Sequence, residues 1–327
     1  MSSVAWPTDP DHLREALLAW YDDGHREFPW RDDADPWAIL VSEVMSQQTQ
    51  LDRIVEPYRE FVDRWPTPGA LAAADRSAVV AFWTDHSLGY NNRARYLHEA
   101  AAMVVEEFDG SLPADRDSLQ TLQGVGPYTA TAVAAFAFDR PVAVVDTNVE
   151  RVLYRLLEGV REHDDPPYDA LIEELLAPDR PAAFNNAIME LGGVACTPTP
   201  ACDDAACPFR SHCHAYRTGD FTAPDVPTQP AFDGSRRQFR GRVLRTLADG
   251  PRPVDAVGHA VRVDYDPAGD PGREWLDGLL DDLERDGLIE RRESDGERVV
   301  ALRSSDSPAE TRDATAETRD ATADGPD

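Results

Sequence analysis

The stretch Leu122-Gln-Gly-Val-Gly-Pro-Tyr-Thr-Ala130 decides the fold. It lies between two segments with helical patterning, and its two glycines permit a tight turn in backbone conformations that other residues avoid. Pro127 then begins a helix whose first backbone N–H groups have no partner within the helix. Such a helix start binds an anion without basic side chains. Taken alone, the stretch fits either an ordinary corner between helices or a helical hairpin that holds a phosphate.

Helical patterning extends outward from this hairpin over residues 8–216, with hardly any alternation of apolar and polar residues. We expect helices to begin near residues 10, 36, 71, 77, 93, 117, 127, 147, 168 and 181. Residues 219–234 contain three prolines and indicate a linker. Residues 236–303 then predict a separate unit of three helices followed by a hairpin that turns at Asp295-Gly296, an order typical of a winged helix.

The chain has 327 residues, of which 42% are hydrophobic, and a net charge of -29. This length suggests about two domains with a real core. Every one of the 32 basic residues is arginine, so chemistry through a lysine Schiff base is excluded. Acid spread this evenly resembles the proteins of halophilic organisms, and we interpret it as an adaptation to salt that says nothing about partners.

No apolar run approaches the roughly 20 residues of a membrane span, and the N-terminus shows no export signal. We therefore expect a cytoplasmic protein with no membrane partner. The C-terminal tail repeats the seven residues Ala309-Glu-Thr-Arg-Asp-Ala-Thr from Ala316 onward. The repeat has no apolar residue larger than alanine and cannot bury enough surface to fold, so we expect disorder.

All four cysteines lie within eighteen residues, at Cys196, Cys202, Cys207 and Cys213. Four thiolates together suit either tetrahedral zinc or an iron–sulfur cluster. Zinc sites usually show Cys-x-x-Cys pairs, which are absent from this sequence, and a cytosolic location disfavours disulfides. The spacing indicates one metal site and leaves both metals open.

Two acidic residues lie in contrasting surroundings. Glu43 is flanked by apolar residues within a predicted helix, where burial should raise its pKa and make it a proton donor near neutral pH. Asp146 precedes a helix that begins near Thr147, whose N-terminal dipole favours an anion. A protonated and an ionised carboxyl are the pair that cleavage of a glycosidic bond needs. A structural ion pair for Glu43 and a capping role for Asp146 stay open, and Thr147-x-x-Glu150 is a capping box that competes for that role.

Six motifs occur in one order: Phe28-Pro-Trp-Arg31, Ser42-Glu-Val-Met-Ser-Gln-Gln-Thr49, Leu88-Gly-Tyr-Asn-Asn-Arg-Ala94, Gly124-Val-Gly-Pro-Tyr128, Val145-Asp-Thr-Asn-Val149 and the four cysteines. Over residues 10–216 this order resembles the helix-hairpin-helix DNA glycosylases with an iron–sulfur cluster, specifically the adenine glycosylases of the MutY family. The resemblance implies an all-α fold of two lobes. We expect a six-helix domain (35–142), a cluster domain (1–34 and 143–216), a linker (217–235), a winged-helix-like domain (236–303) and a disordered acidic tail (304–327).

The resemblance also implies a role for each motif. Glu43 would protonate adenine, Asp146 would stabilise the sugar cation, and Tyr128 and Asn148 would position these two carboxyls. The remaining roles are a wedge that fills the DNA stack once adenine is flipped out, backbone donors to phosphate, a pocket for the base, and ligands of a [4Fe-4S] cluster. The wedge would be Gln48 and Tyr90, and the backbone donors would be Gly124, Val125 and Gly126. The base pocket would include Trp30, Arg31 and Asn186. The cluster ligands would be Cys196, Cys202, Cys207 and Cys213.

Tyr128 stands where the lyase relatives carry a catalytic lysine. The resemblance therefore implies a monofunctional glycosylase that acts as a monomer on double-stranded DNA and removes adenine mispaired with 8-oxoguanine or guanine. Thymine glycosylases acting on T:G mismatches are the nearest rival, and a non-enzymatic redox sensor is the alternative from another class.

Three features depart from the family pattern. The cysteines are separated by five, four and five residues instead of six, two and five. Asn186 replaces a longer Gln or Glu. The winged-helix-like unit stands in place of a Nudix-like domain that reads 8-oxoguanine, and it could bind duplex DNA or a partner protein.

Overall fold

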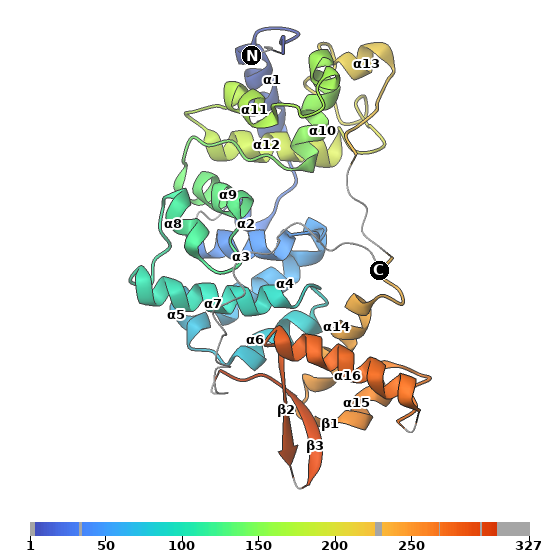
Figure 1. The fold of residues 1–327 in the computed structure, drawn as a ribbon. Coiled ribbons are helices and arrows are strands. Elements are labelled where there is room, and N and C mark those ends of the chain that lie inside the picture. The colour runs from blue at the N-terminus through green and yellow to red at the C-terminus, as the bar shows by residue number, and fades with distance from the viewer. Residues whose placement is uncertain (1–3, 33–34, 226–230, 268, 295, 306–327) are drawn as a thin grey trace.

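The computed structural model describes residues 4–32, 35–225, 231–267, 269–294 and 296–305. Two helical lobes are stacked one above the other, with a smaller unit at the lower end (Figure 1). The predicted disordered tail lies outside the described residues, apart from Ser304 and Ser305. Within the described part of the chain, no helix is long and apolar enough to cross a bilayer.

The first lobe is built from seven helices that surround one apolar core. α3, which is buried along most of its length, packs against α4 and α9, and the fully buried side chains of Phe61 and Trp83 fill the centre. Capping aspartates begin several of these helices. The helices are α3 (Pro36–Ser46), α4 (Leu51–Arg64), α5 (Pro68–Ala72), α6 (Arg76–Asp85), α7 (Asn92–Glu107), α8 (Arg116–Thr121) and α9 (Pro127–Phe138).

The second lobe combines the N-terminal helix with the segment that follows residue 143. α1 packs against α11 and α12, and its buried Leu13 and Leu17 share a core with Phe184 and Leu191. The short helix α2 (Pro29–Asp32) leads from α1 to the first lobe. The other helices are α1 (Pro10–Asp23), α10 (Thr147–Leu156), the 3-10 helix η1 (Glu158–Glu162), α11 (Tyr168–Leu175), α12 (Pro181–Val194) and α13 (His214–Thr218).

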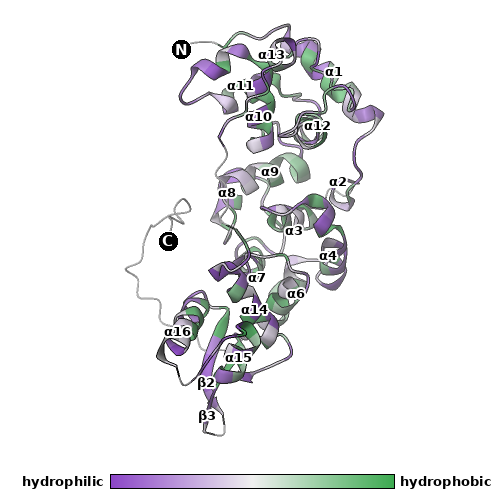
Figure 2. Cartoon of the chain, turned by 90° about the vertical axis from the view of Figure 1, so that its right-hand side faces the viewer, coloured by the Kyte–Doolittle hydropathy of each residue, from purple (hydrophilic) through white to green (hydrophobic). Residues whose placement is uncertain are grey.

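A seam of small residues joins the two lobes. Ala132 and Ala135 of α9 form a separate apolar cluster with Val144, against which Met189 of α12 packs. α9 lies between the lobes and is coloured mostly as hydrophobic in Figure 2. The fully buried Asn185 fixes the connecting segment, because its side chain bonds to the backbone of Val142 and Val144 at 2.9 Å each.

The C-terminal unit contains the predicted order of three helices and a hairpin. The helices are α14 (Arg236–Leu247), α15 (Val254–Val261) and α16 (Asp270–Arg285), and the hairpin strands are β2 (Ile289–Ser294) and β3 (Glu297–Leu302). The two strands are antiparallel, with Arg291 opposite Val300. The turn prediction includes Asp295, which lies outside the described residues. A two-residue strand, β1 (Arg252–Pro253), adds a third antiparallel strand in the order β1-β3-β2.

This unit is packed against the first lobe. α14 and β3 contact α6, and buried Val243, Leu244 and Leu247 of α14 belong to the same apolar cluster as Val80 and Trp83 of α6. The C-terminal unit and the first lobe therefore share one continuous core, although a proline-rich segment separates them in the sequence.

Candidate active site

A cavity of about 580 Å³ lies between the two lobes. α3 and the start of α9 line it from the first lobe, and α10 and α12 line it from the second. The cavity brings together every predicted catalytic residue and every predicted base-pocket residue. They are Trp30, Arg31, Glu43, Tyr128, Asp146, Asn148 and Asn186.

Glu43 lies on α3, where almost every neighbouring side chain is buried. Burial raises the pKa of its carboxyl to about 7, and the nearby charge of Asp146 contributes to the rise. The hydroxyl of the adjacent Ser42 donates its hydrogen bond to the Ile39 carbonyl, 2.8 Å away. Glu43 is therefore present in both protonated and ionised forms near neutral pH, which suits a proton donor.

Asp146 is the N-cap of α10. Its Oδ1 accepts hydrogen bonds from the backbone N–H groups of Asn148 at 2.9 Å and Val149 at 2.8 Å, and its Oδ2 accepts one from the Asn148 side chain at 2.7 Å. Of the two capping residues left open by the sequence, Asp146 and Thr147, the structure has Asp146 at the capping position. Three donors thus fix the direction of this carboxylate, and it still lines the cavity.

The orientation of Asp146 depends in turn on Arg151. The Arg151 Nη2 donates to the Asn148 Oδ1 at 2.7 Å and to the Gly192 carbonyl at 2.9 Å, and its Nε donates to the Cys196 carbonyl at 2.6 Å. A side chain at Gly192 would meet the Cβ of Asn148 at 2.6 Å, so only glycine leaves room for Asn148 here. Polar contacts therefore connect the cavity with the first cysteine.

Tyr128 begins the second half of the predicted hairpin, in the first turn of α9. Burial of its hydroxyl, with added repulsion from Glu43 and Asp146, raises the pKa of Tyr128 above its usual value. The hydroxyl therefore stays protonated and can donate a hydrogen bond inside the cavity.

One charged cluster at the cavity was missed in the sequence. The buried carboxylate of Glu190 accepts from Arg26 Nε at 2.7 Å and from Arg31 Nη2 at 2.8 Å. Burial opposes ionisation of Glu190, but the hydrogen bonds from the two guanidinium groups lower its pKa overall. Glu190 lies four residues after Asn186, on the same face of α12, and that spacing was the available signal. Asn186 itself donates to the Ala182 carbonyl of its own helix at 3.1 Å.

The predicted DNA-contact residues lie outside the lining of this cavity. Gln48 and Tyr90 both have left-handed backbones, with φ of 55° and 42°. In the hairpin, Gly124 has φ of 78°, and a Cβ there would meet that of Tyr96 at 2.7 Å. Val125 differs from the expectation, because its N–H donates to the Leu122 carbonyl at 3.1 Å and its side chain is buried. Its amide is therefore not available to a phosphate.

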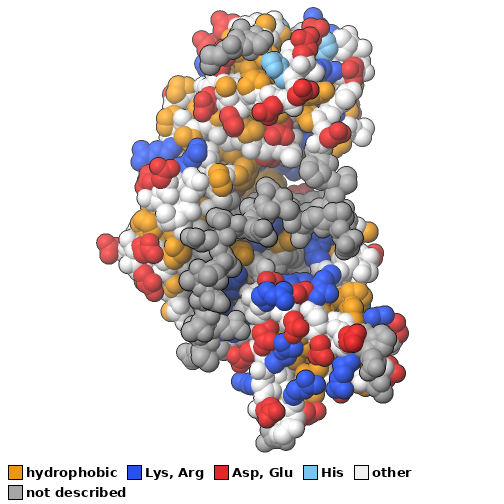
Figure 3. All heavy atoms as spheres, in the orientation of Figure 1, with side chains coloured by type: hydrophobic (Ala, Val, Ile, Leu, Met, Phe, Trp, Pro, Cys, Tyr) orange, Lys and Arg blue, Asp and Glu red, His pale blue; other side chains and the backbone are white. Residues whose placement is uncertain are grey.

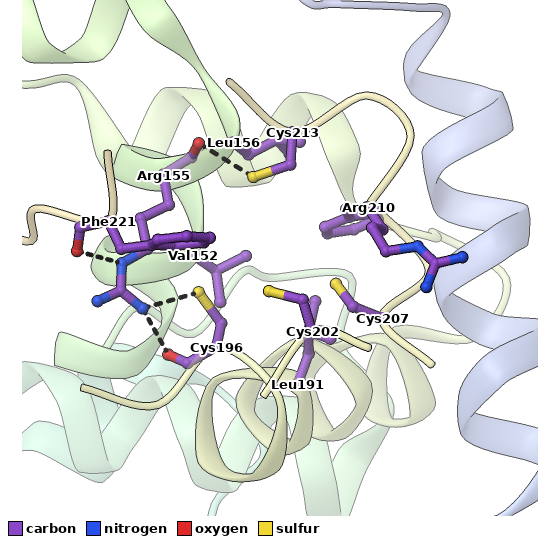
Figure 4. Close-up of a pocket in the computed structure, with 11 residues that line it drawn as sticks. Val152, Arg155, Leu156, Leu191, Cys196, Cys202, Cys207, Arg210, Cys213 and Phe221 are labelled. Carbon is purple, nitrogen blue, oxygen red and sulfur yellow. Dashed lines mark hydrogen bonds between the residues drawn. The ribbon is translucent and has the colours of Figure 1, made fainter. Parts of the chain in front are cut away.

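The four cysteines surround one space beside α10 (Figure 4). Apolar side chains such as Val152 and Leu191 form much of its wall, and the Arg155 Nη1 lies 3.5 Å from the Cys196 Sγ. Burial raises the pKa of Cys207 to about 12 and also raises those of Cys202 and Cys213, so bare thiols would stay protonated. All four thiols are unbridged.

The sulfur arrangement bears on the choice of metal. Among the described residues, no three His, Cys, Asp or Glu side chains are grouped closely enough to share one metal ion. A single zinc ion would draw all four sulfurs to about 2.3 Å from one point. A cluster, in which each cysteine binds a different iron, needs a wider cage. Four thiols around one space can serve as the ligands of either kind of metal centre.

Residues 41–178 match the HhH-GPD superfamily of base excision DNA repair proteins. The adenine DNA glycosylase of Mycolicibacterium smegmatis is 40% identical over 290 residues, which cover 87% of this chain and 94% of that protein. A thermostable thymine-DNA glycosylase matches 64% of this chain and 97% of its own, with a TM-score of 0.59 and 27% identity. Endonuclease III trapped in a covalent DNA intermediate matches 65% of this chain and 99% of its own, with a TM-score of 0.54 and 25% identity.

The mycobacterial relative matches more of the chain than the solved glycosylases do, so the similarity to it extends into the C-terminal unit. The similarity in sequence to the adenine glycosylase and the similarity in fold to the solved glycosylases both include the motifs around the cavity. On this evidence the chain belongs to the adenine DNA glycosylase family within the HhH-GPD superfamily of base excision repair proteins.

Proposed function

We propose that this protein hydrolyses the N-glycosidic bond of adenine mispaired with 8-oxoguanine or guanine. The observation that carries the proposal is the meeting of Glu43 and Asp146, from opposite lobes, in one cavity. Glu43 has a pKa suited to donating a proton, and Asp146 is a carboxylate held by three N–H donors. These are the two groups that a glycosidic bond requires.

In the proposed reaction, adenine leaves the helix stack and enters the cavity. Glu43 donates its proton to a ring nitrogen of the base, so that the base departs as a neutral leaving group. The Asp146 carboxylate faces the sugar and offsets the positive charge that develops there, until water adds to the sugar carbon that lost the base and releases a proton. Asn148 fixes the orientation of the Asp146 carboxylate. The Tyr128 hydroxyl lies in the same cavity and would donate a hydrogen bond to one of the two carboxyls.

The wall of the cavity formed by Trp30, Arg31 and Asn186 is proposed to receive the base. Glu190 and Arg26 support that wall, because the same carboxylate binds both arginines. Arg31 is thereby held in one orientation, with its side chain 7% exposed. A guanidinium fixed in this way can donate to adenine without first losing its conformational freedom.

We further propose that Cys196, Cys202, Cys207 and Cys213 hold a [4Fe-4S] cluster. When bound, the cluster would order the cysteine loop and supply the positive charge that keeps the four sulfurs ionised. Arg151 and Arg155 support the backbone of the first cysteine, whose carbonyl accepts from both.

Double-stranded DNA that contains a mispair is the proposed partner, bound by a monomer in the cytoplasm. Gly124 and Gly126 are exposed and would offer backbone donors to a phosphate at the start of α9. Gln48 and Tyr90 would fill the stack after the adenine is flipped out.

A panel of duplexes tests the proposed function. Wild-type protein and Glu43→Gln are incubated in high salt with A:8-oxoguanine, A:G, T:G and A:T duplexes, and abasic sites are then cleaved with alkali. We expect wild-type cleavage of the adenine strand in the first two duplexes alone, and loss of about 10²-fold or more in Glu43→Gln with DNA binding retained. Cleavage of the thymine strand in T:G would favour the rival activity. Intact strands in every duplex would refute a glycosylase.

A further inference from the structure

α14 of the C-terminal unit carries five arginines and no acid, in a chain of net charge -29. On the face shown in Figure 3, acidic side chains outnumber basic ones over the upper lobe, whereas basic side chains are frequent, among acidic ones, over the C-terminal unit. Two of the five, Arg236 and Arg240, form ion pairs with Asp282 and Asp286 within this unit. Two others, Arg237 and Arg245, reach across to the first lobe.

The segment that these two arginines contact is the loop of residues 87–90, between α6 and α7. Three of its four residues have left-handed backbones: φ is 54° at Ser87, 69° at Gly89 and 42° at Tyr90. Residues other than glycine rarely adopt such φ values, so this loop needs contacts that hold it in place. Trp83 supplies one from inside the lobe, by donating to the Gly89 carbonyl at 2.8 Å.

α14 holds the same loop from outside at both ends. Arg245 Nη2 donates to Ser87 Oγ at 3.0 Å, and Arg237 Nη1 donates to the Tyr90 hydroxyl at 2.5 Å. These arginines are eight residues apart, which corresponds to about 12 Å along a helix. The C-terminal unit therefore spans the loop that carries Tyr90.

The Tyr90 ring also lies against two guanidinium groups. The guanidinium carbon of Arg93 is 4.3 Å from the ring centroid, and that of Arg237 is 5.2 Å from it. Arg93 in turn donates to the carbonyl of Gln47, the C-cap residue of α3, at 2.5 Å. A series of contacts thus leads from the C-terminal unit through Tyr90 to the helix of Glu43.

We infer that Arg237 is a positioning residue for Tyr90: it holds this side chain and its strained loop in the conformation that engages duplex DNA beside the flipped adenine. The inference rests on the proposed function, which assigns Tyr90 to DNA contact. All of the residues that line the cavity lie between Arg26 and Gly193. The C-terminal unit therefore affects excision by setting the position of Tyr90, with no side chain of its own at the reacting base.

Arg236→Ala is a matched control for Arg237→Ala, because each removes one positive charge from adjacent positions of α14. Single-turnover excision from A:8-oxoguanine duplexes is measured for both. Base unstacking is followed in a Glu43→Gln background by the fluorescence of 2-aminopurine placed next to the mispair. We expect Arg237→Ala to lower the excision rate about tenfold and to reduce the fluorescence, with Arg236→Ala within about twofold of wild type.

Tyr90→Ala supplies the second half of the test. If Arg237 acts through Tyr90, adding Arg237→Ala to Tyr90→Ala should change the rate by less than about twofold. Losses that multiply would overturn the inference, as would an Arg237→Ala protein that behaves like Arg236→Ala. Arg237→Lys serves as a second variant if Arg237→Ala folds poorly. It keeps the charge without the planar guanidinium, so it should bind DNA normally and still show reduced fluorescence.

Failure of this inference is distinguishable from failure of the proposed function. Wild-type protein that excises no adenine, with fluorescence that still responds to Arg237→Ala, would defeat the glycosylase proposal alone. Normal excision with equal effects of Arg236→Ala and Arg237→Ala would defeat the positioning role alone.

Discussion

Glu43 is the residue whose surroundings predict the most, because its proton is needed for the proposed reaction and is lost near neutral pH. Burial penalises the charged carboxyl and raises its pKa to about 7. The single-turnover rate should therefore be constant below that pH and fall about tenfold for each pH unit well above it. A rate profile from acidic to alkaline pH, with helicity followed in parallel, checks this. A flat profile through alkaline pH would show that Glu43 does not supply the proton.

The same pKa has a consequence for stability. A carboxyl whose pKa is raised from 4.5 to about 7 on folding destabilises the folded protein when it ionises, so stability is lost as pH rises through this range. Glu43→Gln cannot ionise. At pH 8 it should unfold at a higher temperature than wild type, by the equivalent of about 3 kcal/mol, with little difference at about pH 4, below the unfolded pKa. Glu56→Gln, at an exposed ion pair, is the control and should shift neither value.

Local sequence was informative for some site residues and silent for others. Glu43 and Asp146 could be found because an apolar helix and a helix start are both readable from neighbouring residues. The pairing of Arg26 with Glu190 could not, because 164 residues separate them and only the fold brings them together. The amide of Val125 was misjudged because the turn that engages it depends on the observed backbone.

At the scale of elements, the start of α10 allows charge and capping to be separated. Asparagine caps helices about as well as aspartate, so Asp146→Asn should keep the stability within about 1 kcal/mol while excision falls by 10²-fold or more. Thermal unfolding and single-turnover excision measure the two effects. Thr147→Ala is the control. Because Thr147 is exposed and does not cap the helix, a loss of stability there comparable to a lost cap would contradict the observed geometry.

The hairpin before α9 gives a second pair of substitutions. Gly124→Ala places a Cβ against Tyr96 at a left-handed position, so it should destabilise the fold by about 2 kcal/mol. Gly126 has φ of -80° and open space at its Cβ, so Gly126→Ala should leave stability within about 0.5 kcal/mol. It should nevertheless weaken DNA binding if a phosphate approaches this backbone closely. Unchanged DNA affinity in Gly126→Ala would remove the hairpin from the DNA interface.

Most helix starts could be predicted, because aspartate caps and first-turn prolines mark them directly in the sequence. α4 was missed because Pro57 in its interior is ordinarily a sign of interruption. The buried face formed by Ile54, Tyr58 and Phe61 outweighs that local cost. β1 was missed because a two-residue strand exists only through its pairing with β3.

At the scale of the whole molecule, the shared core predicts that the C-terminal unit supports the first lobe. Removing residues 232–327 would expose the α6 surface that α14 covers. We expect a lower unfolding temperature and aggregation, measured by calorimetry and light scattering in high salt. Removing residues 306–327 is the control and should leave the unfolding temperature unchanged. An equally stable protein after the larger truncation would show that the shared core contributes nothing.

The two-lobed architecture could be predicted from the order of motifs, because the family that they resemble has two helical lobes. The docking of α14 on α6 did not follow, because about 150 residues separate the two helices and a proline-rich segment suggested independence. Contacts across such distances leave no periodic signal in a single sequence.

The alanine seam between the lobes bears on how variants of this enzyme should be screened. Glu43 and Asp146 are carried by α3 and the start of α10, which pack into separate cores joined by the small cluster around Ala132, Ala135 and Val144. A substitution that widens the seam could misalign the two carboxyls while each half keeps its own packing. The unfolding temperature of such a protein would be close to that of wild type. Surveys of inherited or engineered changes in this region therefore need a direct assay of base release.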